Sequence, residues 1–277
     1  MELTANPSTP VQPTLSTPRA FVLHLWAFVL PLITLTYWLT GPHPWWASIL
    51  WLLPIVVLVL IDNHAPNDFR QPREDMAHWP FNLQCYALFA IQMANHILLG
   101  VTASKMSIDS TENIINAVAM LLPVSVLAGT TAGYSGIVLA HEFVHRRNPI
   151  EYFMGRLLLM FVLNEQFATE HIRGHHPRIG TRKDPATARF GETHKNFVRR
   201  TIPQQFVSAW RLEKIRLGDP NLKPGDLRWL RHRVLQGVVA EITILASFFY
   251  FFGWMAFVYL LVQSRTAVIL LETVNYI

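Results

Sequence analysis

The sequence is poor in cysteine and in charged residues. Both shortages argue against particular kinds of site and classes of protein. It contains a single cysteine, so no disulfide can form within the chain, and an iron–sulfur cluster or a structural zinc site of cysteines is disfavoured. Only 15% of its 277 residues are charged, whereas 51% are hydrophobic. This composition is typical of a polytopic membrane protein rather than a soluble enzyme.

Acidic residues are scarce where basic residues gather. Residues 141–236 hold 18 of the 23 Lys and Arg residues but only 9 Asp and Glu residues. In a soluble protein this excess would suggest nucleic acid. Because apolar runs flank the segment here, the positive-inside rule explains the charge better, and no nucleic-acid partner is expected.

Long apolar runs are abundant, and six of them have the length of membrane spans. They are residues 21–40, 45–61, 81–101, 114–140, 238–252 and 255–277. We expect residues 1–18, rich in Thr, Pro and Ser, to form a flexible tail, and residues 19–277 to form a single membrane-embedded domain. The predicted fold is an all-α polytopic membrane helical bundle of about six spans with a His-rich helical cap, residues 141–236.

The order of the spans predicts the side of the membrane on which the His-rich cap lies. Four spans precede residues 141–236, so this segment lies on the same side as the N-terminus. The positive-inside rule assigns that side to the cytoplasm. We therefore expect a multi-pass protein of the cell inner membrane with its histidines at the cytoplasmic surface.

Five of the twelve histidines lie between residues 141 and 176, in two short boxes at the start of the cap. The first box contains His141 and His145, and the second contains His171, His175 and His176. On a helix, residues four apart lie on the same face, near enough to share a metal ion. Neutral imidazoles without cysteine suit iron, copper, nickel or zinc, so the boxes predict a metal site.

Two metal chemistries fit the first box. His141-Glu142-x-x-His145 has the pattern of a membrane zinc metalloprotease, in which Glu142 would be the general base. Such an enzyme needs one further ligand downstream but has no use for three clustered histidines. A pair of iron ions needs many more ligands, and the second box therefore favours two metals.

The second box and the residues after it resemble those of the integral-membrane di-iron alkane monooxygenases. These are relatives of the xylene monooxygenases and, more distantly, of the membrane fatty acid desaturases. The likeness extends from about residue 60 to residue 277. It is carried by Glu170-His171-x-x-Gly174-His175-His176, Asp184-Pro185-Ala186, Arg189-x-Gly191-Glu192, Ile202-Pro203, Ala209-Trp210-x-Leu212-Glu213 and Leu271-Glu272-x-Val274-Asn275-Tyr276.

The resemblance implies a function and its cofactors. The two boxes would bind part of a non-haem centre of two iron ions, and O2 would be the co-substrate. The activity would be terminal hydroxylation of alkanes or related hydrocarbons to primary alcohols. Electrons would come from rubredoxin, supplied by rubredoxin reductase, and the substrate would enter from the membrane lipid. Desaturase-type lipid oxidation is the first alternative, and the zinc metalloprotease is the second.

Further residues are expected to support this site. Glu142, Glu170 and Asp184 are the nearest carboxylates that could accept hydrogen bonds from the imidazoles and fix their tautomers. Trp51 is bulky enough to limit the length of a substrate in an apolar channel. His96 is an ionisable residue within an apolar run, which makes it a second candidate for the channel.

The end of the sequence departs from the pattern of the resembling family. In that family the segment matching Asn275-Tyr276-Ile277 leads directly into a third His box, and a fourth follows. Neither box is present here. We therefore expect a C-terminally truncated copy, which is inactive as it stands.

Overall fold

The computed structural model describes residues 14–66, 70–73 and 75–277. Residues 1–13 of the predicted flexible tail lie outside this range. At the end of that segment, Thr14–Leu15 form a strand and a helix begins at Thr17. Pro18 lies in the first turn of this helix, where its missing amide hydrogen costs no hydrogen bond.

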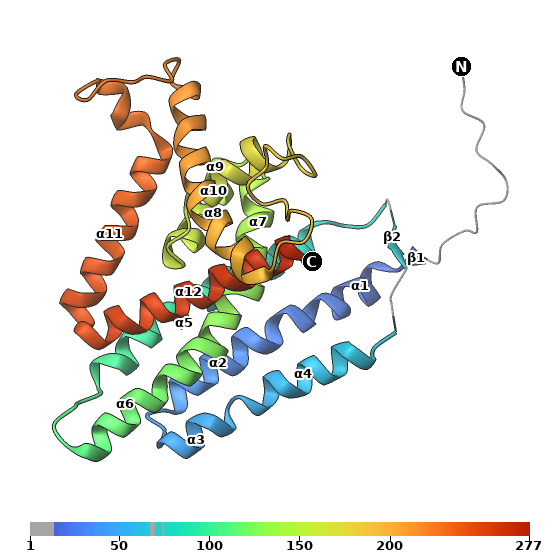
Figure 1. The fold of residues 1–277 in the computed structure, drawn as a ribbon. Helices are drawn as coiled ribbons and strands as arrows, with labels where there is room; N and C mark the ends of the chain where they lie inside the picture. The colour runs from blue at the N-terminus through green and yellow to red at the C-terminus, as the bar shows by residue number, and fades with distance from the viewer. Residues whose placement is uncertain (1–13, 67–69, 74) are drawn as a thin grey trace.

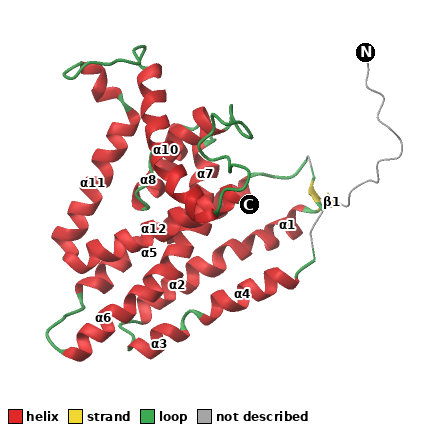
Figure 2. Cartoon of the chain, in the orientation of Figure 1, coloured by secondary structure: helices red, strands yellow, loops and turns green. Residues whose placement is uncertain are grey.

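Helices make up most of the described chain (Figure 2). The α-helices are α1 (Thr17–His24), α2 (Val29–Thr40), α3 (Trp45–Leu50), α4 (Leu53–His64), α5 (Trp79–Ser104), α6 (Thr111–Pro123), α7 (Val138–Val144), α8 (Pro149–Phe161), α9 (Phe167–Glu170), α10 (His194–Arg216), α11 (Arg233–Phe252) and α12 (Trp254–Tyr276). The 3-10 helices are η1 (Leu25–Phe28) and η5 (Leu227–Arg231), and the π-helices are η2 (Val124–Gly129), η3 (Thr131–Ile137) and η4 (His171–His175). Strands β1 (Thr14–Leu15) and β2 (Gln71–Pro72) pair in parallel.

Six helical segments of the described chain are long and apolar enough to cross a membrane. They are Thr17–Thr40, Trp45–His64, Trp79–Ser104, Thr111–Val144, Arg233–Phe252 and Trp254–Tyr276. Each predicted span matches one of them to within five residues at either end. The prediction of an all-α polytopic membrane protein is therefore confirmed.

The exposed faces of these helices are apolar, as lipid contact requires. Helix α4 has no buried residue, and Val56, Val57 and Leu60 on it are each more than half exposed. In water such a helix would be an aggregation hazard, whereas hydrocarbon solvates it well. Gly253, with a φ of 86°, ends α11 and turns the chain into α12, so that the two helices pack as neighbours.

Two apolar clusters hold the bundle together. The first joins α2, α5, α6, η2, α11 and α12 around buried residues such as Tyr37, Leu127 and Leu260. The second joins α7, α8 and α9 to α5, with Phe143, Leu158 and others at its centre. Helices α7 to α10 gather at one end of the long helices, beside the C-terminus (Figure 1). The second cluster therefore supports the His-rich cap.

Candidate metal centre

The first His box lies at the end of the fourth candidate span. Two π-helical segments, η2 and η3, precede α7, so the helix is wound unusually just before His141 and His145. Their ring centroids are 4.7 Å apart, as the four-residue spacing predicts. The side chain of Gln92 on α5 donates a hydrogen bond to the Thr131 carbonyl at 3.3 Å and braces η3 from the side.

The second box is π-helical, and this changes which histidines meet. The His176 amide donates to the His171 carbonyl at 3.0 Å, a five-residue step. Consequently Nε2 of His176 lies 2.8 Å from Nε2 of His171, whereas the ring of His175 is stacked 5.5 Å from that of His171. The four-residue pairing expected for His171 and His175 is therefore replaced by a pairing of His171 with His176.

The two boxes converge on one point. Ligand nitrogens of His141, His145, His171 and His176 all lie within 4.8 Å of one another. Nε2 of His171 is 3.2 Å from Nε2 of His145, and the rings of His141 and His171 have centroids 4.5 Å apart. Four imidazole nitrogens aimed at a common centre match the ligand number and type of a transition-metal ion. The residues present thus fit one metal ion.

The cluster favours neutral imidazoles. Burial, together with the neighbouring His141, lowers the pKa of His171 to about 3. Burial and the adjacent His145 and His175 also lower the pKa of His176. Neutral imidazoles keep a free lone pair, which is the form that binds a metal ion.

His175 lies beside this group of four and is fixed by Asp184. Its Nδ1 is 2.9 Å from Oδ2 of Asp184, a buried side chain. The carboxylate is itself held by the Thr187 hydroxyl at 2.6 Å and by the Ala186 amide at 3.0 Å. A carboxylate on Nδ1 directs the Nε2 lone pair outward, as is usual for a ligating histidine.

Glu170 is buried under the second box. Both of its carboxylate oxygens lack a hydrogen-bond partner among the described residues. Burial raises its pKa to about 7. The carboxylate lies directly over Gly174, where an added Cβ would be 2.2 Å from Oε1. A side chain at position 174 would therefore force the Glu170 carboxylate to move.

Among the described residues, Glu142 forms no hydrogen bond with the imidazoles of the two boxes. Its side chain is 56% exposed and forms an ion pair with Arg146 at 3.0 Å. Arg146 also binds Glu151 at 2.8 Å. The general base of a protease would need to face a metal-bound water, whereas this carboxylate is held by a guanidinium at the surface.

Sequence reasoning missed the residue that holds the loop after the second box. Arg200 on α10 donates to the carbonyls of Pro185 and Thr187 at 2.9 and 3.1 Å and pairs with Glu192 at 2.7 Å. It thereby fixes the loop that carries Asp184. The Asp-Pro and Gly-Glu motifs of the resemblance were a signal for this loop, but nothing in the sequence linked them to an arginine on a later helix.

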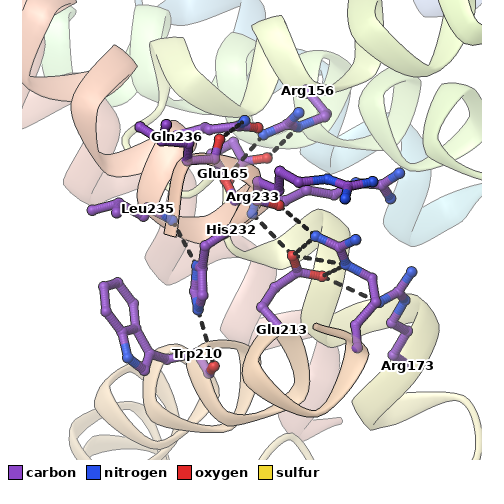
Figure 3. A network of polar contacts seen from close by, with 12 residues as sticks. Arg156, Glu165, Arg173, Trp210, Glu213, His232, Arg233, Leu235 and Gln236 are labelled. Carbon is purple, nitrogen blue, oxygen red and sulfur yellow. Dashed lines mark hydrogen bonds and ion pairs between the residues drawn. The ribbon is translucent and has the colours of Figure 1, made fainter. Parts of the chain in front are cut away.

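Glu213 on α10 belongs to a motif of the resemblance, but the sequence assigned it no role. Its side chain is fully buried. It lies beside arginine side chains (Figure 3). It pairs with Arg216 at 2.7 Å and with Arg173 at 3.1 Å, and it accepts a hydrogen bond from the Arg233 amide at 2.9 Å. Arg173 lies between the histidines of the second box. Glu213 therefore ties that box to α10 and to the start of α11.

The two channel candidates lie elsewhere in the bundle. Trp51 is half-buried against the first apolar cluster, with its ring edge-on to Tyr37 at 5.7 Å. His96 is buried, stacks on Phe161 at 4.8 Å and has Nδ1 3.1 Å from Nε2 of Gln263. Partners of this kind are those of a satisfied core histidine. A channel through these residues stays a prediction.

Fold and site together define an all-α membrane protein with clustered imidazoles suited to a transition metal. A sequence model of the fatty acid desaturase family matches residues 117–277, more than half of the chain and both His boxes. The chain belongs to the fatty acid desaturase family.

Within that family, the chain is similar to several curated alkane 1-monooxygenases. The chain is 36% identical to alkane 1-monooxygenase 1 of Pseudomonas aeruginosa over 149 residues, which are 54% of this chain and 38% of that protein. It is 26% identical to alkane 1-monooxygenase 2 of Alcanivorax borkumensis over 264 residues, 92% of this chain and 66% of that one. An alkane 1-monooxygenase of Pseudomonas putida is 27% identical over 223 residues, 80% and 53% of the two chains. The chain thus spans between 38% and 66% of the length of these relatives.

Proposed function

We propose that this chain belongs to an oxygen-dependent hydroxylase that converts alkanes or related hydrocarbons to primary alcohols. The observation that carries the proposal is the convergence of four imidazoles from two boxes on one point. The similarity to several alkane 1-monooxygenases supports the reaction class. A non-haem iron centre would supply the chemistry that activates O2 and attacks an unactivated C–H bond.

The residues of the cap would hold this iron. His141, His145, His171 and His176 would bind one ion through their converging nitrogens. His175, whose Nδ1 is held by Asp184, would be a ligand of the second ion of a di-iron centre. An all-imidazole shell carries no charge, so it leaves the full positive charge on the metal.

The apolar environment would bring substrate to the site. Alkanes dissolve in the hydrocarbon of a bilayer, and the cluster lies at the end of a candidate span. An apolar path between the helices, with Trp51 and His96 as its candidate lining, would bring the terminal carbon of the alkane to the metal site. The helix packing would exclude water from the reacting carbon.

Electrons would come from a soluble donor at the basic surface of residues 141–236. Rubredoxin, served by rubredoxin reductase, is the expected donor, since a small acidic protein would be attracted to this surface. We place the cap on the cytoplasmic side of the cell inner membrane, because the excess of basic residues follows the positive-inside rule. Turnover should then fall steeply at high salt, and salt-independent turnover would contradict docking at this surface.

Metal content tests the proposal directly. The protein should be purified in detergent under anaerobic, iron-replete conditions, and its iron and zinc measured by mass spectrometry. His145→Ala and His171→Ala should each lower the iron content strongly. His64→Ala, at an exposed histidine whose ring bonds the Leu60 carbonyl of its own helix, is the matched control and should leave it unchanged. One zinc ion with no iron would contradict the proposal.

Product analysis tests the reaction. With an added electron donor, an alkane and ¹⁸O2, the hydroxylase should form a primary alcohol that carries the label. An alkene would instead identify a desaturase. An unlabelled alcohol would show that O2 is not the source of the oxygen.

A further inference from the structure

A groove of about 460 Å³ lies where α10 meets the start of α11. Its walls are mostly apolar and come from both helices. The lining residues are Phe206, Val207, Trp210, Arg211, Lys214, Leu235 and Val238. On α10 they occupy the face opposite Thr201, Gln205 and Ala209, which are buried in the protein. The groove is therefore separate from the contacts that support the His boxes.

Two cations border this groove without an anionic partner. Among the residues that the structure describes, neither Arg211 nor Lys214 forms an ion pair, and no acidic residue lines the groove. A second cavity of about 600 Å³ on the other side of Arg211 adds Arg178 and Lys183. Exposed cations beside an apolar surface form a site that is complementary to an anionic amphiphile.

With α11 as a membrane span, the groove would lie at the depth of a lipid headgroup. Helix α11 is a candidate span that begins at Arg233, so Leu235 and Val238 belong to its first turns. Trp210 lies beside them, with its ring 4.5 Å from that of His232, whose Nδ1 caps α11 through the Leu235 amide (Figure 3). Tryptophan prefers this interfacial level of a membrane.

An apolar stripe continues from the groove down α11. Leu235, Val238, Val239 and Ile242 follow the spacing of one helix face. Val239 and Ile242 are 56% and 60% exposed, so this face is open for an acyl chain. Arg211 and Lys214 thus line the same groove as the first residues of this stripe.

We propose that the groove between α10 and α11 binds one anionic phospholipid. Arg211 and Lys214 bind its phosphate, and an acyl chain lies along Val239 and Ile242. The ligand is a membrane lipid rather than a free phosphate, because the wall of the groove is apolar and leads into the span.

Native mass spectrometry of the detergent-purified protein tests this proposal. Dioleoyl phosphatidylglycerol is compared with zwitterionic dioleoyl phosphatidylcholine at equal concentration. The wild type should bind the anionic lipid more tightly by about fivefold per cation, roughly thirtyfold for two. Arg211→Gln combined with Lys214→Gln should remove this preference. Lys195→Gln combined with Arg199→Gln changes the same charge on the same helix outside the groove and should leave it intact.

Two further measurements keep the test independent of folding. Leu235→Trp fills the apolar wall and keeps both cations, and it should also weaken binding of the anionic lipid. Circular dichroism should show that each variant retains the helix content of the wild type. Equal binding of both lipids by the wild type, or equal binding of the anionic lipid by the wild type and the Arg211–Lys214 variant, would overturn the proposal. Competition by glycerol 3-phosphate would overturn the assignment to a lipid.

Discussion

Substitutions at Gly174 and Glu170 should have effects on the free energy of unfolding that are coupled strongly enough to measure. An added Cβ at Gly174 would be 2.2 Å from the nearest oxygen of Glu170, so the carboxylate must retreat by about 1 Å to reach ordinary contact. Glu170 is buried, and its displacement strains the packing of α9 against α10. We expect Gly174→Ala to lower the free energy of unfolding by about 1–3 kcal/mol, the usual cost of overpacking.

The matched background is Glu170→Ala, which removes the group that the new methyl would strike. In that background Gly174→Ala should be neutral, or stabilising by up to about 1 kcal/mol, because alanine is the better helix former. The wild type, the two single variants and the double variant form a double-mutant cycle. The thermal unfolding of all four proteins would be compared in one detergent. A cost of 1–3 kcal/mol corresponds to a fall in Tm of roughly 2–10 °C for a chain of this size.

The cycle has a clear refuting result. If Gly174→Ala costs as much in the Glu170→Ala background as in the wild type, the glycine is required for another reason and the carboxylate does not fill its space. Iron content of the same four proteins gives an independent readout. Gly174→Ala should also reduce it, because the π-helical turn that brings His171 to His176 surrounds Gly174.

Three further changes probe the contacts that hold the cap. Asp184→Asn should weaken metal binding about 10–100-fold in a metal-buffer titration, because it removes the charge that holds His175; unchanged affinity would argue against His175 as a ligand. Arg200 lowers the pKa of Glu192 to about 2, so their ion pair stabilises the fold above the unfolded-state pKa and this contribution is lost as the pH falls from about 4.5 to 2. Glu192→Gln should therefore show a smaller decrease in Tm over that window than the wild type, and parallel profiles would contradict the argument. Glu213→Gln should cost about 1–3 kcal/mol in unfolding titrations, since it removes the buried carboxylate that two partly exposed guanidinium groups share, and a cost below about 0.5 kcal/mol would mean that they find other partners.

The sequence by itself determined the class of the fold and the position of the spans. Apolar runs of the right length admit only helices in a bilayer, because every backbone polar group must be satisfied within its own segment. The pairing of imidazoles within the first His box was also predictable. The four-residue spacing of His141 and His145 brings their imidazoles together on an ordinary helix.

Only the tertiary structure decided which histidine of the second box joins that pair. The π-helical turn moves His176 into the place that the α-helical spacing assigned to His175, and a winding of this kind depends on packing rather than on local pattern. The supporting contacts of Arg200 and Glu213 were equally out of reach of the sequence. Each joins segments well apart in the chain, and periodicity describes one element at a time, not the partner it will meet.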